Sequence, residues 1–271
     1  MRVAVGADAD HELTEGDTMT TATAAPPTQR EPELLGQTVV VIGGSAGIGL
    51  ATARRARAEG ADIILVGRDP ARLQHAAGEV GARSTATFDA NDLAALESFF
   101  ARLEGPIDHV MVTAGGPYYA PLAEMDFDEA RRALQEHPML MVGVARHAAG
   151  KVRRGGTLLF MGGTGARRPG VGVGISSAMT AALPALTASL ALEIAPVRVN
   201  LIAAGFVDTP LSATLLGDQL EERRTNLRTT LPIGRVVGPA DVAALAVHIM
   251  TNTALTGATF DIDGGQQLLP G

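Results

Sequence analysis

Residues 38–50 read TVVVIGGSAGIGL, and this stretch decides the fold. Its β-branched run predicts a buried parallel strand, and the Ala- and Arg-rich segment from Gly47 to just before Gly60 predicts a helix. Glycines at positions 43, 47 and 49 let the backbone approach a pyrophosphate, whose charge is favoured by the N-terminus of a helix. Glycine also ends strands for purely structural reasons. Strand, glycine turn and helix together predict the first half of a nucleotide-binding βαβ unit.

The composition limits the function classes that are open to the chain. Its 271 residues, 46% of them hydrophobic, are enough for one large α/β domain. A net charge of −7 argues against a nucleic-acid surface, and no basic run suggests contact with an anionic membrane. Cys is absent, which excludes disulfides and cysteine nucleophiles and is compatible with the cytoplasm. The six His show no paired spacing, so no metal site is predicted.

Two segments differ in composition from the rest. Residues 1–32 are rich in Thr, Ala, Pro and acidic residues and lack apolar periodicity, so we expect a disordered tail before a domain at 33–271. The tail lacks the basic start and apolar centre of a secretory signal. Residues 175–195 carry one charge, Glu193, but also Pro184 and five Ser or Thr hydroxyls. We expect a buried or subunit-interface helix there, not a membrane span.

Downstream of the opening stretch, apolar strands alternate with helical segments. Strands are predicted at 62–66, 85–88, 107–113, 157–161, 197–203 and 259–262, and helices at 71–80, 93–104, 126–152, 175–195 and 239–250. We expect Asn91 or Asp92 to cap the third helix, and Pro138 to interrupt the fourth. The alternation predicts an α/β fold: a single doubly wound domain whose mostly parallel, seven-stranded sheet has helices on both faces. Ligands then bind beyond the carboxyl ends of the strands.

The order of these segments resembles the short-chain dehydrogenase/reductase family across about residues 34–265. Gly43-x3-Gly47-Ile48-Gly49 is similar to its cofactor glycine motif, and Ala114-Gly115 to half of its Asn-Asn-Ala-Gly motif. Further similarities are LTASLALE at 186–193, VRVN at 197–200, AGFVDTP at 204–210 and DIDGG at 261–265. The resemblance implies a Rossmann-type domain that binds a nicotinamide dinucleotide.

The resemblance also implies a choice of cofactor. Gly67 stands where NAD-preferring members carry an acidic residue, and Arg68 stands where NADP-preferring members carry a base. A guanidinium matches a 2′-phosphate in geometry and charge, so NADP(H) is predicted; otherwise Arg68 is a solvated loop residue. Asp89 matches an adenine-contacting residue, with a helix N-cap as the alternative. The cofactor-binding candidates are Gly43, Ser45, Gly47, Ile48, Gly49, Arg68, Asp89, Ala114, Gly115, Val207 and Thr209.

The catalytic signature departs from the family pattern. The family's Tyr-x3-Lys pair falls on Ser176 and Thr180, and its supporting Ser falls on Gly163. Its helical Asn falls within residues 134–137, which contain no Asn. A serine hydroxyl lacks the acidity of the family's tyrosine, and a threonine brings no positive charge. A positioned acid or base is worth about 10²–10⁴ in rate, so another group must take this role in ordinary ketone reduction.

Other residues are candidates for that role. The chain has only two tyrosines, Tyr118 and Tyr119, and both follow the fourth strand at the ligand-binding edge. Glu136 and His137 are candidate partners, since histidine is the natural acid or base at cellular pH. Ser176 is a candidate for hydrogen bonding to substrate, but not for an unaided nucleophile. Alternatively, the tyrosines cover apolar surface, and Glu136 and His137 face solvent.

Three functional hypotheses follow. The first is an NADP(H)-dependent oxidoreductase with relocated acid/base groups, acting on a small carbonyl, alcohol or activated alkene. The second is a non-redox lyase, isomerase or cyclase on the same scaffold, and the third is a catalytically inactive NADP(H)-binding sensor. Fold alone does not distinguish them. We expect a cytoplasmic homodimer or homotetramer that pairs through the helix at 175–195 and takes a small-molecule substrate.

Overall fold

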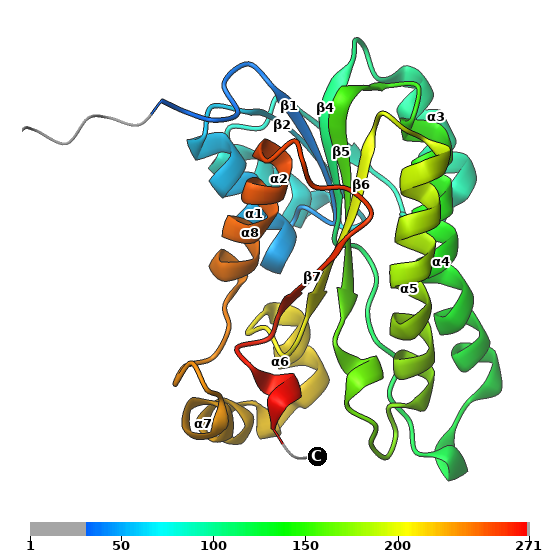
Figure 1. The fold of residues 1–271 in the computed structure, drawn as a ribbon, viewed down its shortest axis with the longest axis vertical. Coiled ribbons are helices and arrows are strands. Elements are labelled where there is room, and N and C mark those ends of the chain that lie inside the picture. The colour runs from blue at the N-terminus through cyan, green and yellow to red at the C-terminus, as the bar shows by residue number, and fades with distance from the viewer. Residues whose placement is uncertain (1–30, 270–271) are drawn as a thin grey trace, which may run out of the picture. The chain divides into compact units, whose positions relative to one another are not determined.

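A seven-stranded sheet forms the centre of the computed structural model, which describes residues 31–269 (Figure 1). The strand order is β3-β2-β1-β4-β5-β6-β7, and every pair is parallel. The predicted tail, apart from its last two residues, lies outside the described range. The strands are β1 Thr38–Ile42, β2 Asp62–Gly67, β3 Ser84–Thr87, β4 Ile107–Val112, β5 Val152–Gly163, β6 Arg198–Ala204 and β7 Thr259–Ile262. The predicted doubly wound parallel sheet is confirmed.

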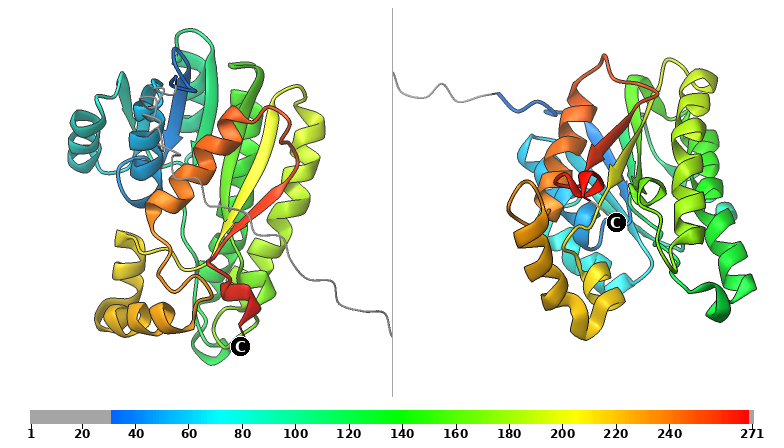
Figure 2. Two further views of the ribbon diagram at one scale, coloured as in Figure 1. Left: turned by 60° about the vertical axis from the view of Figure 1, so that its left-hand side comes forward. Right: turned by 60° about the horizontal axis from the view of Figure 1, so that its bottom comes forward.

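The long helices cover both faces of this sheet. One face carries α1 (Gly47–Ala58), α2 (Pro70–Val80) and α8 (Pro239–Thr251), and the other carries α3 (Leu93–Arg102), α4 (Phe127–Ala148) and α5 (Gly174–Glu193) (Figures 1 and 2). Alternation along β1 explains the two cores. Val39 and Val41 pack in the core beneath α1, α2 and α8, whereas Val40 and Ile42 pack in the core beneath α3, α4 and α5.

The helix α4 runs without interruption through Pro138, so the predicted break is wrong. Proline removes one backbone hydrogen bond, but here the rest of the helix is well supported. The Asp126 side chain caps its N-terminus by accepting from two backbone amides, and Leu140, Met141 and Val144 are buried in the core. The helix ends at Ala148, four residues before its predicted end, because β5 already begins at Val152.

Two helices after β6 have no counterpart in the sequence-based prediction. They are α6 (Pro210–Leu216), which starts with a capping box between Thr209 and Ser212, and α7 (Leu220–Thr230). Only Leu227 of α7 is buried, so this helix lacks the apolar periodicity by which helices are recognised. Both helices lie beyond the carboxyl ends of β6 and β7, where a ligand is expected (Figure 1).

By length and composition alone, α5 could cross a membrane. Its most apolar 18-residue window has a mean hydropathy of 1.5, and 39% of that window is buried. The helix packs against α4 and β6, and Met179, Leu183 and Leu190 belong to the core of that face. A core helix of an α/β domain passes the same test, which agrees with the interpretation of α5 as a buried helix.

Candidate functional site

The turn between β1 and α1 leaves no room for a side chain at Gly43 or Gly49. Gly43 and Gly47 have φ values of 91° and 54°, which favour glycine. A Cβ on Gly49 would lie 2.3 Å from the Gly43 carbonyl oxygen. No side chain caps α1, and its first turn has no acidic residue, so its N-terminal amides are available to an anion. This arrangement fits the pyrophosphate of a dinucleotide.

Thr113 connects the glycine turn to the end of β4. Its hydroxyl oxygen lies 3.2 Å from the Ile42 carbonyl oxygen and 3.1 Å from that of Gly43, and its amide donates to Ile42 at 2.7 Å. Ala114 and Gly115 follow directly, so the structure brings these two predicted cofactor residues to the same edge of the sheet as the turn. A threonine thus makes a tertiary contact at the position where the family pattern has asparagine.

The end of β2 presents a basic side chain next to the turn. The Ser45 hydroxyl oxygen would lie 3.3 Å from a Cβ on Gly67, so Ser45 borders this strand end. The Arg68 side chain is 77% exposed, and its Nη1 lies 3.9 Å from Asp89 Oδ2. Asp92, not Asp89, caps α3, accepting from the amides of its first turn. The N-cap alternative for Asp89 is therefore wrong, and the expected cap at position 92 is confirmed.

The loop after β6 approaches the glycine turn from the other side. Thr209 caps α6, and its side chain would lie 3.6 Å from a Cβ on Gly47. Val207 is buried and bridges to Val237, while Ser212 Oγ donates to the Val207 carbonyl oxygen at 2.7 Å. The loop that carries the cofactor-binding candidates Val207 and Thr209 is thus held in a defined conformation beside the turn.

At the position of the family's catalytic tyrosine, the side chain of Ser176 is hydrogen-bonded to the backbone of another loop. Ser176 is buried in the first turn of α5, and its Oγ accepts from the Tyr118 amide at 3.0 Å and donates to the Tyr118 carbonyl oxygen at 2.6 Å. Thr180 Oγ1 donates back to the Ser176 carbonyl oxygen at 2.8 Å within the same helix. Both hydroxyls are therefore engaged with the protein itself, and Ser176 holds the β4–α4 loop.

The two tyrosines have different environments. The Tyr118 hydroxyl lies 3.0 Å from the Asp126 amide and 3.3 Å from the Asp126 carbonyl oxygen, so it closes the loop that leads into α4. Tyr119 is 56% exposed at the outer edge of the same loop. Desolvation raises the pKa of the Tyr119 phenol, and the charge of Arg223 opposes that shift. Of the two phenols, only Tyr119 has a hydroxyl that is not bonded to the backbone.

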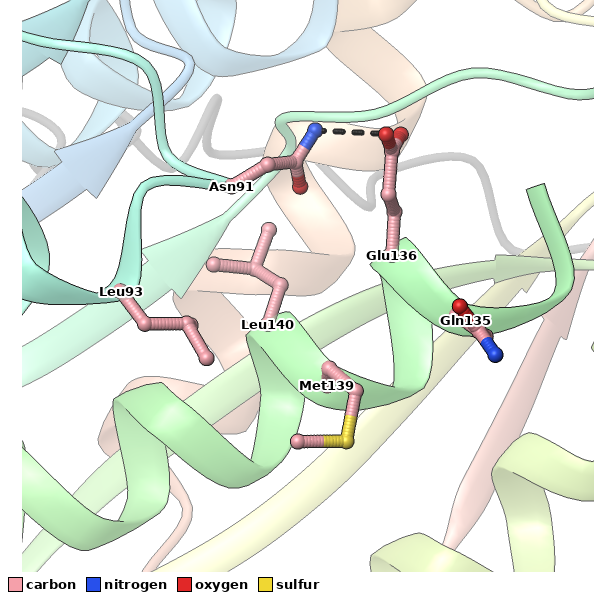
Figure 3. A pocket seen from close by; sticks show the side chains of 6 residues that line it. All are labelled: Asn91, Leu93, Gln135, Glu136, Met139 and Leu140. Atoms are coloured by element: carbon pink, nitrogen blue, oxygen red, sulfur yellow. Dashed lines mark hydrogen bonds between the residues drawn. The ribbon is translucent and has the colours of Figure 1, made fainter. Parts of the chain in front are cut away.

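His137 and Glu136 do not both face solvent. His137 Nε2 donates to the Met161 carbonyl oxygen at 2.8 Å, and its Nδ1 would lie 3.0 Å from a Cβ on Gly115. Burial lowers the pKa of His137, so the ring is neutral near pH 7 with its proton on Nε2. Glu136 points away, and its carboxylate accepts from Asn91 Nδ2 at 3.2 Å (Figure 3). Glu136 and His137, the predicted partners of the tyrosines, thus contact different parts of the protein.

A hollow of about 150 Å³ lies between the start of α3 and the middle of α4 (Figure 3). The Asn91–Glu136 contact spans one side of this hollow, and three apolar side chains and Gln135 form the remainder of its wall. The lining residues are Asn91, Leu93, Gln135, Glu136, Met139 and Leu140. Within residues 31–269 there is no group of three or more His, Asp or Glu side chains that could hold a metal ion.

The outer edge of the site holds two residues that the sequence did not single out. Arg223, on α7, places its guanidinium carbon 5.8 Å from the centre of the Phe206 ring, and Arg168 lies close enough for their charges to interact. Neither residue belongs to a recognisable motif, and no apolar pattern predicts α7. Their proximity is visible only in the tertiary structure.

Comparison with known proteins agrees with this geometry. A family model described as enoyl-(acyl carrier protein) reductase matches residues 43–267. The short-chain dehydrogenase/reductase ATR9 of Stachybotrys chlorohalonatus is 28% identical over 252 residues, which cover 86% of this chain and 98% of that protein. The chain belongs to the short-chain dehydrogenase/reductase family.

Two solved structures show the same fold. The MalC reductase/Diels-Alderase of Malbranchea aurantiaca superimposes with a TM-score of 0.80 at 26% identity, covering 88% of this chain and 99% of that one. A small-chain dehydrogenase in complex with NADPH gives a TM-score of 0.74 at 26% identity, covering 86% and 99% of the two chains. The resemblance inferred from the motifs is thus confirmed at the level of family and fold.

Proposed function

We propose that the protein is an NADP(H)-dependent oxidoreductase that acts on a small carbonyl, alcohol or activated alkene. The observation that carries this proposal is the glycine turn, which excludes a side chain at Gly43 and Gly49, beside an uncapped helix N-terminus and with Arg68 at the end of the neighbouring strand. Gly67 brings no carboxylate to repel a 2′-phosphate. A structural neighbour solved with NADPH supports the same assignment.

In this proposal, different residues of the chain bind different parts of the cofactor. Amides of the glycine turn and of α1 bind the pyrophosphate, and the Arg68 guanidinium with the Ser45 hydroxyl binds the 2′-phosphate. Asp89 orients Arg68 through their contact. Val207 and Thr209 meet the nicotinamide end. The bound cofactor supplies or accepts the hydride.

We assign proton transfer to Tyr119. Its hydroxyl, unlike that of Tyr118, is not bonded to the backbone, so the protonated phenol can donate a proton to a substrate oxygen as a hydride is added to the adjacent carbon. Burial raises its pKa and so weakens it as an acid, while the charge of Arg223 opposes that shift. Ser176 acts as a positioning residue because it fixes the backbone one residue before Tyr119. His137 positions the Gly115 segment that forms the floor of the site.

A second candidate function rests on the engagement of Ser176 and Thr180. Both positions of the family's proton-transfer pair are occupied by hydroxyls that are bonded to the protein itself, so the chain lacks this pair. A non-redox reaction does not require it. The structural neighbour described as a reductase/Diels-Alderase carries two reaction types in its description. Product formation that continues without NADP(H) would favour this candidate, whereas stoichiometric NADPH oxidation would exclude it.

Calorimetric titration with NADPH and NADH tests the proposal before any substrate is known. We expect NADPH to bind the wild type more tightly than NADH, and Arg68→Ala to remove most of that preference. Arg72→Ala is the matched control, since Arg72 is a neighbouring exposed arginine that pairs with Asp69. Absence of binding by either nucleotide, or an equal loss in the two variants, would contradict the proposal.

We also propose that the protein is a cytoplasmic homodimer or homotetramer that pairs through α5. Although α5 packs on the core with one side, Leu192 near its end is 83% exposed. Pairing of two such helices would remove apolar surface from water. Sedimentation at micromolar concentration tests this directly, and a monomer under these conditions would contradict it.

A further inference from the structure

The chain turns sharply after β7, and this C-terminal turn (residues 263–268) lies beyond the carboxyl end of the sheet (Figure 1). Asp263 is buried, and its carboxylate accepts from the amides of Gly265 and Gln267 at 2.8 and 2.9 Å. Gly265 has a φ of 85°, and a Cβ there would lie 2.7 Å from Pro232 Cγ, just after α7. The C-terminal turn is therefore fixed in conformation and packs closely against the segment that follows α7.

The side chain of Gln266 connects the C-terminal turn to the loop after β6. Gln266 is buried, and its Oε1 accepts from the Phe206 amide at 2.9 Å. A Cβ on Gly205 would lie 2.6 Å from the same Oε1, so only glycine lets the amide oxygen come this close. Val207, which is assigned to the nicotinamide end, directly follows Phe206 in the chain. Gln266 thus holds the backbone one residue before Val207.

A second contact ties the C-terminal turn to the loop between β5 and α5. Arg167 lies in that loop, where its Nη1 donates to Gln267 Oε1 at 2.8 Å and pairs with the Asp261 carboxylate. Gln267 Nε2 in turn donates to Asp261 Oδ2 at 3.2 Å. Because the turn is held from this second side, Gln266 is presented to Phe206 by a fixed segment.

The amides of the loop after β6 are held by different parts of the chain. The Asp208 amide donates to the Val237 carbonyl oxygen at 2.9 Å, and the Thr209 amide donates to Ser212 Oγ at 2.8 Å. The Phe206 amide instead depends on a side chain that lies 60 residues further along the sequence. Loss of that acceptor leaves a backbone donor unpaired, which favours movement of the segment toward water.

We propose that Gln266 is a positioning residue for the nicotinamide end of the cofactor, because it fixes the backbone of Phe206 and thereby that of Val207. The inference rests on the proposed function, in which Val207 and Thr209 meet the nicotinamide. The adenosine half is assigned to other elements, the glycine turn and Arg68. Within residues 31–269, Gln266 makes no hydrogen bond to either of them. Gln266 therefore acts on one half of the cofactor.

Calorimetry with NADP⁺ and with adenosine 2′,5′-bisphosphate, which lacks the nicotinamide half, tests this inference. Gln266→Leu removes the acceptor for the Phe206 amide at similar side-chain size. We expect it to weaken NADP⁺ binding by about 10-fold, the effect of one lost hydrogen bond, and to leave binding of the bisphosphate unchanged. Arg68→Ala should give the opposite pattern and weaken both ligands, because both carry the 2′-phosphate.

Two further variants separate the hydrogen bond from other effects of the substitution. Gln266→Glu keeps an acceptor oxygen and should restore most of the NADP⁺ affinity that Gln266→Leu loses. Gln74→Leu changes an exposed glutamine of α2 and should alter the binding of neither ligand. Amide exchange at Phe206 should be faster in Gln266→Leu than in the wild type and in Gln74→Leu.

The outcomes distinguish this inference from the proposed function. Equal NADP⁺ affinity in the wild type and Gln266→Leu overturns the inference, even if exchange at Phe206 is faster, and leaves the proposed function standing. An equal loss of both ligands in Gln266→Leu means that Gln266 supports the whole fold, which also overturns it. So does a loss of NADP⁺ affinity in Gln266→Glu as large as in Gln266→Leu. A wild type that binds neither ligand refutes the proposed function itself.

Discussion

The turn between β1 and α1 and the first turn of α5 lie at the same edge of the sheet but differ in how they follow the family pattern. The glycine turn keeps the pattern because space demands it: at Gly49 even a methyl group would collide with backbone. The start of α5 has replaced both reactive side chains, and Ser176 and Thr180 are satisfied by the protein's own backbone. Sites built from backbone tolerate little change, whereas side-chain chemistry can move to other elements.

The largest expected effect is at the glycine turn. In Gly49→Ala the new Cβ would lie 2.3 Å from the Gly43 carbonyl oxygen and 2.6 Å from Thr113 Oγ1, so the turn must open. We expect NADPH binding to fall below detection in calorimetry. Gly78→Ala is the control, because a Cβ there has no neighbour within 4 Å, and it should leave binding intact. If Gly49→Ala retained its affinity for NADPH, the claim that space restricts the glycine turn would be contradicted.

The next effect concerns the stability of the carboxyl-terminal half. The buried Arg198 guanidinium donates at 2.7–3.1 Å to the carbonyl oxygens of Gly155, Ile249, Met250, Asn252 and Leu255. Arg198→Met would remove the donor to all five oxygens, of which Leu255 retains the Asn200 Nδ2 donor, so we expect a loss of about 3–5 kcal/mol in urea unfolding. Arg131 is exposed and pairs with Asp128. Arg131→Met should lower the free energy of unfolding by less than about 0.5 kcal/mol. Similar losses in both variants would contradict this account.

A smaller effect is expected at the start of α5. Ser176→Ala removes the acceptor for the Tyr118 amide and the donor to its carbonyl oxygen. We expect a loss of about 1–3 kcal/mol in unfolding free energy and faster amide exchange at Tyr118. Ser189→Ala changes an exposed serine of the same helix and should do neither. Unchanged exchange at Tyr118 would mean that Ser176 does not hold this loop.

The smallest effect is a dependence of stability on pH. Burial, with a smaller contribution from Arg198, lowers the pKa of His109 from 6.5 to about 3. Below pH 6.5 the unfolded chain binds a proton that the native state excludes, so stability falls by up to about 1.4 kcal/mol per pH unit. His109→Gln should reduce this slope in urea titrations between pH 7 and 5, and the exposed His75→Gln should not. Parallel slopes for wild type and His109→Gln would contradict the assignment.

The sequence predicted most of the fold because strands and helices of this sheet carry strong apolar periodicity. It missed α6 and α7, which have few buried side chains, and it placed a break at Pro138 that tertiary packing overrides. Boundaries shifted where a turn intervened, as between Ala148 and Val152. Local pattern is thus a good guide to elements that build the core and a poor guide to those that cover the site.

The candidate site divides in the same way. The glycine turn and Arg68 follow from the sequence, since a motif of adjacent residues makes the turn and a single position after β2 bears the charge. The engagement of Tyr118 by Ser176 and of His137 by Met161 links residues 58 and 24 positions apart. No local pattern encodes such a contact.

By itself, the sequence determined the parallel sheet, the backbone surface for a dinucleotide and the absence of the family's Tyr-x3-Lys pair. Only the tertiary structure decided which hydroxyls are already bonded to the protein and that Arg223 lies over the Phe206 ring at the outer edge of the site. The physical reason is range: a turn or a strand is specified by neighbouring residues, whereas desolvation and charge at Arg223 depend on segments brought together by folding.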